Sequence, residues 1–162
     1  MSDLVIRRAA PADLAAAGET TVAAYREFTL GDDDPYLRKL RDAATRDREA
    51  ELWVAELDGA VVGTVTIALE GSPWREIGEA GEGEFRMLAV APAARRRGVG
   101  DALMQLVLER FRELGARAIV LSSLAEMTSA HRVYERLGFR RMPERDWSPV
   151  PGVDLVVYRK EL

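Results

Sequence analysis

The apolar positions in the second half of the chain alternate between helical stripes and short uninterrupted runs. One stripe has the spacing of an amphipathic helix and ends at Gly115, a residue that commonly stops a helix. A run of four apolar residues, Ala118–Leu121, follows it and predicts a strand buried on both faces. A second stripe begins where Thr128 or Ser129 could cap it and ends at Gly138. The two stripes are formed by Leu103, Leu106, Val107, Phe111 and Leu114, and by Ala130, Val133, Tyr134 and Leu137.

The first half predicts helices followed by an antiparallel hairpin. Pro11 suits the first turn of a helix, and the aspartate-rich turn 31–35 separates this helix from a second one. Asp58-Gly59 supplies the positive φ of a tight turn and so predicts a hairpin, while the glycine-rich segment 70–83 predicts a loop. The expected elements are strand Leu4–Arg7, helices Ala12–Tyr25 and Tyr36–Asp47, hairpin strands Leu52–Leu57 and Ala60–Leu69, strand Glu84–Val90 and strand Leu155–Tyr158.

This order of elements predicts a single α/β domain over residues 1–162. Neither an internal repeat nor a linker interrupts the pattern, and 162 residues are enough to bury a substantial core. The composition, 48% apolar and 31% charged, is typical of a folded soluble protein.

The net charge and the scarcity of cysteine and histidine argue against several kinds of site. The chain has 23 basic and 27 acidic residues, a net charge of −4, which disfavours a nucleic-acid partner. It has no cysteine and one histidine, so thiolate and multi-histidine metal sites are excluded and no metal is expected. The first residues lack the apolar core of a signal peptide, and no run reaches bilayer length. We therefore expect a cytoplasmic protein with no membrane partner.

A basic, glycine-containing segment joins strand Glu84–Val90 to the first helical stripe. Pro92 ends the strand, Arg95–Arg97 follow, and Gly98 and Gly100 lie where the helix begins. The first N–H groups of a helix lack intrahelical partners and carry partial positive charge, and glycine lets the backbone approach a bulky phosphate. Three arginines at this end oppose the helix dipole unless an anion is bound. The segment therefore predicts a pyrophosphate-binding turn.

The common nucleotide motifs do not match this turn. It lacks the Lys-Ser/Thr pair of a P-loop and the third glycine of the dinucleotide fingerprint. A generic nucleotide-phosphate site and merely solvated arginines at a flexible turn are the alternatives.

Two spaced motifs resemble one family. Leu88-x-Val90-x-Pro92-x-x-Arg95-x-x-Gly98-x-Gly100-x-x-Leu103 is similar to the acetyl-CoA-binding motif of the GNAT N-acetyltransferases, and Ala130-x-x-x-Tyr134-x-x-x-Gly138-Phe139 resembles the motif that follows it there. The resemblance implies a single-domain GNAT-like fold with a mixed, mostly antiparallel central sheet flanked by helices. It also implies that strands Glu84–Val90 and Ala118–Leu121 splay apart to admit the cofactor.

The resemblance implies acetyl-CoA as co-substrate. In such proteins the strand before the turn offers backbone groups to the pantetheine arm, and the turn wraps the pyrophosphate through main-chain N–H groups, with the arginines near the phosphates. The cofactor-binding residues implied are Leu88, Ala89, Val90, Arg95, Arg96, Arg97, Gly98, Val99, Gly100 and Asp101.

Two residues are candidates for the chemistry. Tyr134 resembles the general acid of the family, and acetyl transfer calls for one because it expels a thiolate whose conjugate thiol has a pKa of about 8.5. A tyrosine, with a pKa of about 10, is protonated at neutral pH and can donate. Alternation along the strand predicts that Glu84, Arg86, Leu88 and Val90 share one face, in line with the reactive end of the strand, so Glu84 is our candidate base, directly or through water. Pairing of Glu84 with a neighbouring charge is the alternative.

Other residues near the motifs have weaker claims. Glu82 is a weaker substitute for the base, and His131 is more simply a partly exposed helix residue near the cofactor. The chain departs from many relatives in having Met127 where they have Asn, and from some in having Ser122 and Ser123 where they have a glutamate.

The acceptor is expected beside the first two helices and loop 70–83. Asp32-Asp33-Asp34, with Tyr25, Tyr36 and Trp74, could attract and cover a cationic amine, and a solvated acidic turn with ordinary core aromatics is the plainer alternative. The predicted function is transfer of an acetyl group from acetyl-CoA to a primary amine of a small molecule or peptide by direct attack on the thioester. A non-catalytic acyl-CoA sensor is the alternative, and family analogy suggests a homodimer.

Overall fold

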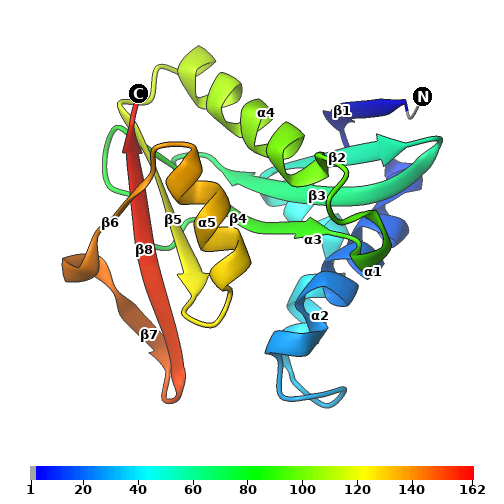
Figure 1. Cartoon of the computed structure of the whole chain (residues 1–162), viewed down its shortest axis with the longest axis horizontal. Helices are drawn as coiled ribbons and strands as arrows, with labels where there is room; N and C mark the ends of the chain where they lie inside the picture. The colour runs from blue at the N-terminus through cyan, green and yellow to red at the C-terminus, as the bar shows by residue number, and fades with distance from the viewer. Residues whose placement is uncertain (1–2) are drawn as a thin grey trace.

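The structure, a computed structural model, describes residues 3–162 as one sheet with helices on both faces (Figure 1). The strands run in the order β1-β2-β3-β4-β5-β8-β6, and β7 pairs with β8. Within the described residues β4 and β5 are parallel and the other pairs antiparallel, which confirms a mixed, mostly antiparallel sheet. The strands are β1 (Leu4–Arg8), β2 (Glu51–Leu57), β3 (Ala60–Ala68), β4 (Glu82–Val90), β5 (Ala118–Leu124), β6 (Arg140–Arg141), β7 (Trp147–Val150) and β8 (Val153–Glu161).

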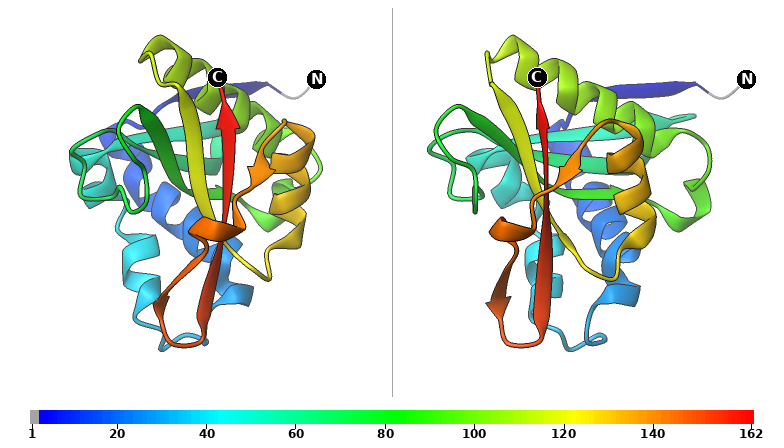
Figure 2. Two further views of the ribbon diagram at one scale, coloured as in Figure 1. Left: turned by 90° about the vertical axis from the view of Figure 1, so that its left-hand side faces the viewer. Right: turned by 60° about the vertical axis from the view of Figure 1, so that its left-hand side comes forward.

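Helices join these strands and form two layers (Figure 2). On one face, Leu103 and Phe111 share a buried cluster with the sheet residues Ile67 and Phe85. On the other face, Met87 packs with apolar side chains of the N-terminal helices. The first layer contains α4 (Val99–Glu113) and α5 (Thr128–Arg136), and the second contains α1 (Leu14–Tyr25), α2 (Tyr36–Arg41) and α3 (Ala43–Glu49). Short 3-10 helices are η1 (Pro11–Asp13), η2 (Arg26–Phe28), η3 (Pro92–Ala94) and η4 (Pro143–Arg145).

The local turns explain where the sequence prediction succeeds and where it fails. The β2–β3 hairpin turns at Asp58 and Gly59, whose φ angles of +52° and +85° are those of the predicted tight turn. The single helix expected over Tyr36–Asp47 is wrong, because Asp42 ends α2 and begins α3. The Asp42 carboxylate accepts the backbone N–H of Thr45 at 3.1 Å. An N-cap of this kind interrupts the helix without disturbing the apolar stripe.

The C-terminal part of the sheet is larger than predicted. β8 extends beyond the expected Leu155–Tyr158, and β6 and β7, which pair with it, have no counterpart in the sequence prediction. Both are short, so they contain too few residues for a periodic apolar pattern. No helix in residues 3–162 is long and apolar enough to cross a membrane.

The two central strands part after a short common stretch. β4 and β5 pair only from Glu82 with Ala118 to Glu84 with Val120. Beyond this point β4 continues beside β3, whereas β5 continues beside β8 to its end (Figure 1). The expected splay of the central strands is confirmed, and it leaves one edge of β4 open.

Candidate functional site

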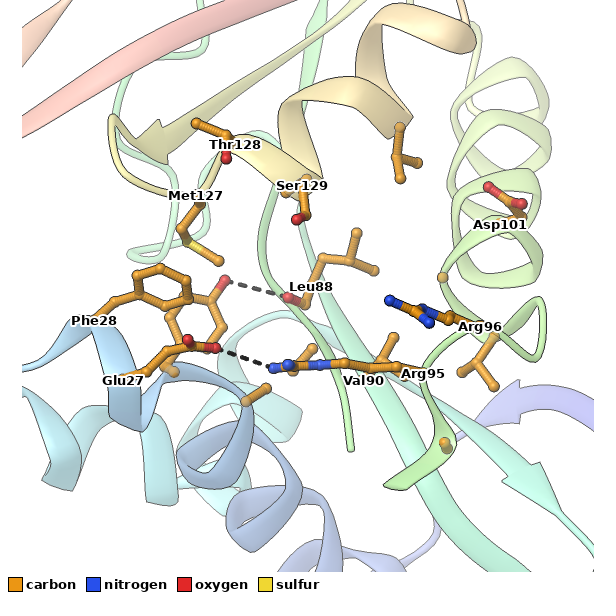
Figure 3. A pocket seen from close by; sticks show the side chains of 18 of the residues that line it. Glu27, Phe28, Leu88, Val90, Arg95, Arg96, Asp101, Met127, Thr128 and Ser129 are labelled. Carbon is orange, nitrogen blue, oxygen red and sulfur yellow. Dashed lines mark hydrogen bonds and ion pairs between the residues drawn. The ribbon is translucent and has the colours of Figure 1, made fainter. Parts of the chain in front are cut away.

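A cavity of about 750 Å³ lies beside the open part of β4 (Figure 3). Its walls come from the end of α1 with η2, from β4, from the turn that leads into α4, and from the first turns of α5. All of the sequence-predicted cofactor residues except Arg97 line it: Leu88, Ala89, Val90, Arg95, Arg96, Gly98, Val99, Gly100 and Asp101. The structure therefore brings the predicted residues together, while their binding role stays a prediction.

Two helix N-termini face this cavity. Gly98 is the N-cap of α4 with a left-handed φ of +78°, and Met127 is the N-cap of α5. Neither cap provides a side-chain hydrogen bond to its helix. The first N–H group of α5, that of Thr128, donates to the carbonyl oxygen of Glu126 at 2.9 Å, whereas the first turn of α4 receives no hydrogen bond from its cap residue's side chain. Arg96 also has a positive φ, +66°, which a side chain other than glycine rarely adopts. A backbone of this shape beside two helix N-termini suits an anion.

Two arginines of the cavity wall are held by carboxylates. Arg95 Nη2 lies 3.2 Å from Glu27 Oε1, so this pair spans the distance between η2 and the turn before α4 (Figure 3). Arg136 Nη2 lies 2.6 Å from Asp101 Oδ1 and connects the end of α5 to the first turn of α4. Glu27 and Arg136 both line the cavity, although the sequence analysis did not single them out. Both residues reach the cavity because of how the helices pack, and no local sequence pattern predicts this packing.

A bulge in β4 changes the predicted faces of the strand. Thr64 pairs with Ala89 and Thr66 with Arg86, so β4 has one residue more than β3 between these pairs. Met87 takes a left-handed φ of +57° there. The side chains of Glu84 and Arg86 therefore lie on the α2 side, whereas Leu88 and Val90 pack toward the α4–α5 core. The predicted common face of Glu84, Arg86, Leu88 and Val90 is wrong, because the extra residue reverses the alternation.

The bulge also places a polar backbone group at the open edge. The carbonyl of Leu88 accepts the hydroxyl hydrogen of Tyr25 at 3.3 Å (Figure 3). Because the N–H and C=O of a strand residue point to the same edge, the Leu88 N–H is expected at this edge too. Burial, and next the nearby Tyr134, raise the pKa of Tyr25, so its hydroxyl stays a donor.

Tyr134 lies in an aromatic cluster behind the cavity wall. Its ring is 5% exposed and packs against Phe85, Phe139 and Tyr158, with ring centroids 5.9–6.0 Å apart. Its neighbour on α5, Val133, lines the cavity. Burial raises the pKa of Tyr134, with a smaller effect from Tyr158, so the phenol remains protonated at neutral pH.

Glu84 is fully buried where β4 and β5 part. Its Oε1 accepts three consecutive backbone N–H groups, from Glu76 at 3.0 Å, Ile77 at 3.0 Å and Gly78 at 2.9 Å. Its Oε2 is buried and has no hydrogen-bond partner among the described residues. The partners of Glu84 are thus backbone groups of the loop between β3 and β4 rather than a cationic side chain. Its role as a base is not tested by this arrangement and stays a prediction.

The weaker candidates have structural partners. Arg145 and Arg159 bind Glu82 at 3.0 Å and 2.8 Å. Burial opposes the charge of Glu82, but hydrogen bonds from Arg145, the backbone N–H of Glu79 and Arg159 outweigh it and lower the pKa to about 2. A carboxylate held in this way is a poor base at neutral pH.

His131 is likewise held by its surroundings. Its Nε2 lies 3.0 Å from Ser123 Oγ and 3.1 Å from the carbonyl oxygen of Leu124, and its ring contacts Tyr158. Because a carbonyl can only accept, Nε2 carries the hydrogen and cannot take a proton from Ser123. Burial lowers the pKa of His131, which favours the neutral ring.

The residues proposed for the acceptor are mostly engaged. Asp34 accepts the N–H groups of Leu30 and Tyr36 at 2.9 Å, so it shapes the turn before α2. The Trp74 ring is covered by the Arg86 guanidinium at 5.5 Å, which leaves that face closed to a substrate cation. Arg86 also pairs with Glu76 at 3.1 Å.

Comparison with known proteins assigns the family. A model of the acetyltransferase (GNAT) family matches residues 19–139, a span that includes both the predicted phosphate-binding turn and Tyr134. The chain belongs to this family. The fold prediction of a single-domain GNAT-like architecture is therefore confirmed.

Relatives of this GNAT chain differ in length and named activity. Mycothiol acetyltransferase of Cellulomonas flavigena is 33% identical over 143 residues, which cover 75% of this chain and 40% of the relative. N-acetylaspartate synthetase of Rattus norvegicus is 37% identical over 103 residues, or 64% of this chain and 32% of the relative. The yncA structure of Salmonella typhimurium with its cofactor acetyl-CoA covers 98% of this chain, and the chain covers 94% of it, with a TM-score of 0.70 and 23% identity. The GNAT chain thus spans less than half the length of these two curated relatives.

Proposed function

We propose that the protein is an N-acetyltransferase that moves an acetyl group from acetyl-CoA to a primary amine of a small molecule or peptide. The observation that carries this proposal is the cavity at the strand splay, where two helix N-termini and three arginines adjoin the open edge of β4. Such a site suits a ligand with phosphates at one end and a hydrogen-bonding arm at the other. The names of the relatives and the cofactor of the Salmonella structure support the same choice.

We assign residues of the cavity to two parts of the cofactor, the pyrophosphate and the pantetheine arm. The N–H groups of Gly98–Asp101 would hold the pyrophosphate, together with Arg95 and Arg96. The backbone of Leu88–Val90 would bind the pantetheine arm along the open edge. Arg97 keeps its predicted place near the phosphates as part of the proposal.

Acetyl-CoA supplies the acetyl group as a thioester. The Leu88 N–H would polarise its carbonyl, because it is fixed at the open edge by the bulge. Glu84, directly or through water, would take the proton that the attacking nitrogen loses, and Tyr134 would donate a proton to the departing sulfur. The C–N bond forms as the C–S bond breaks, so the products are an amide and a free thiol.

A non-catalytic acyl-CoA sensor is the second candidate. The observation that favours it is the burial of Glu84, because a fully buried carboxylate whose Oε1 accepts three N–H groups has no contact with solvent. Both candidates use the same cavity, so they differ only in acetyl transfer.

Release of free CoA in the presence of amines distinguishes the two. We expect one class in a panel of alkylamines, amino acids, peptides and aminoglycosides to cause acceptor-dependent thiol release, with the acetylated amine identified by mass spectrometry. Binding of acetyl-CoA without release across the panel would support the sensor. Failure to bind acetyl-CoA at all would overturn both. A cytoplasmic location and homodimer formation stay predictions.

A further inference from the structure

Two apolar side chains from opposite layers bound the part of the cavity that lies away from the α4 N-terminus. Phe28 belongs to η2, which precedes α2, and Met127 is the N-cap of α5. Both residues line the cavity and are partly buried, and their side chains point toward one another (Figure 3). A phenyl ring and a flexible thioether form an adaptable apolar surface. This apolar pair therefore suits a carbon skeleton rather than a charged group.

An unpaired carboxylate lies next to the apolar pair. Three acidic residues of the described chain line the cavity, and two of them are paired: Glu27 with Arg95 at 3.2 Å and Asp101 with Arg136 at 2.6 Å. The third, Glu126, directly precedes the N-cap of α5 and is exposed. Its carboxylate has no hydrogen bond or ion pair with any other residue in 3–162. A cation that enters the cavity on this side is therefore attracted to Glu126.

The surface that the sequence suggested for the acceptor does not adjoin the open edge of β4. The acidic turn 32–34 and Trp74 are outside the cavity wall, and the Arg86 guanidinium covers the Trp74 ring. Leu88, at the open edge, lines the same cavity as Glu126 and the apolar pair. An amine that attacks a thioester held at Leu88 therefore has these groups as its neighbours.

We propose that the acceptor is an apolar primary amine without a carboxylate, whose carbon skeleton packs between Phe28 and Met127 and whose ammonium group approaches Glu126 before it loses its proton. This inference rests on the proposed acetyl transfer. A carboxylate on the same molecule would lie near Glu126, where like charges repel. A small polar amine would leave the apolar pair in contact with water. Met127, where many relatives have Asn, is then a residue that determines acceptor specificity.

CoA release with three matched amines tests this assignment. 2-Phenylethylamine has an apolar skeleton and one positive charge, ethylamine lacks the ring, and phenylalanine adds a carboxylate. We expect kcat/KM for 2-phenylethylamine to exceed that for ethylamine at least about tenfold, because the ring is removed from water in the complex. It should exceed kcat/KM for phenylalanine by at least about tenfold as well, because the added carboxylate is repelled by Glu126.

Two variants and a control connect these ratios to the named residues. Met127→Asn should lower kcat/KM for 2-phenylethylamine about tenfold and leave that for ethylamine within about twofold. Asn is a good N-cap, so this variant keeps α5 intact. Glu126→Gln should bring phenylalanine to within about threefold of 2-phenylethylamine. Leu30→Ala is the matched control and should keep the parent ratios, because Leu30 follows η2, is 91% exposed and lies outside the cavity wall.

The outcomes separate this inference from the proposed function. Equal kcat/KM for 2-phenylethylamine and ethylamine in the parent, or a preference for phenylalanine, would overturn the apolar acceptor and leave acetyl transfer standing. Transfer to a polar amine of the wider panel with none to 2-phenylethylamine would have the same meaning. Parent ratios in Met127→Asn would overturn the role of the apolar pair. Binding of acetyl-CoA without CoA release for any amine would instead overturn the proposed function.

Discussion

Removal of the Glu84 carboxylate should loosen the loop between β3 and β4 and destabilise the protein. Glu84→Ala leaves the N–H groups of Glu76, Ile77 and Gly78 without their common acceptor. At about 1 kcal/mol for each net hydrogen bond, and more because the acceptor is charged, the loss is at least about 3 kcal/mol. The substitution also removes Oε2, which is buried without a hydrogen-bond partner among the described residues. The desolvation cost of this oxygen disappears with it and offsets any loss of stability beyond about 3 kcal/mol, the value for three net hydrogen bonds. We therefore expect about 3 kcal/mol, or a fall in Tm of about 6–12 °C for a domain of this size.

Urea unfolding and hydrogen exchange measure this effect separately. The unfolding midpoint should decrease at constant slope, and the three loop amides should lose their protection selectively. Glu84→Gln should cost less than Glu84→Ala, because its amide oxygen can still accept the same N–H groups. Glu79→Gln, in the same loop but with a side chain 74% exposed, is the control and should change stability by under about 0.5 kcal/mol. Equal stability of Glu84→Ala and the control, with the three amides still protected, would refute the anchoring of the loop by Glu84.

Three further changes test other parts of the structure. Tyr134→Phe should lower turnover about 100-fold while changing acetyl-CoA affinity less than twofold, and equal turnover of variant and parent across pH would remove Tyr134 from the proposed chemistry. The pKa of folded Glu82, about 2, lies below its ordinary 4.5, so its stabilisation is complete above pH 4.5 and is lost as the pH falls toward 2. Glu82→Gln should therefore cost about 2–3 kcal/mol at pH 7 and flatten the acid side of the stability curve; an unchanged curve would contradict this. Gly83→Ala should cost about 2–3 kcal/mol in urea unfolding, because its Cβ would overlap the Phe111 ring, and a neutral result would show that α4 can move away.

The parts of the fold that the sequence predicts are those with a local physical cause. Asp58-Gly59 predicts its hairpin because few residue pairs accept positive φ twice in succession. Gly98 predicts the start of α4 for a related reason, since a left-handed N-cap with no side chain leaves the helix N–H groups open. In both cases the conformation requires a residue type that tolerates positive φ, so the residue type alone predicts the turn.

The parts that sequence reasoning misses depend on packing between distant segments. Met87 has a left-handed φ although its side chain gives no sign of it, and the bulge is visible only in the register with β3. Arg136 reaches the cavity because α5 lies beside the first turn of α4 across the strand splay. Glu84 was a candidate from its place in the strand, but its three N–H partners come from a loop that has no regular pattern.

The bulge at Met87 reverses which face of the sheet the side chains of β4 point to. With strict alternation, Glu84 and Leu88 would lie on the same face, and the carboxylate would share the α4–α5 layer with the apolar core. The extra residue reverses the faces between them, so Glu84 points toward the loop and α2 side while Leu88 and Val90 pack toward α4 and α5. The strand splay begins directly after Glu84, where the pairing with β5 ends. In the proposed reaction, a thioester held along the open edge of β4 would therefore meet an amine that enters from the side of α2. The bulge at Met87, which the sequence does not reveal, would bring the thioester and the proposed base Glu84 to the same strand from opposite faces.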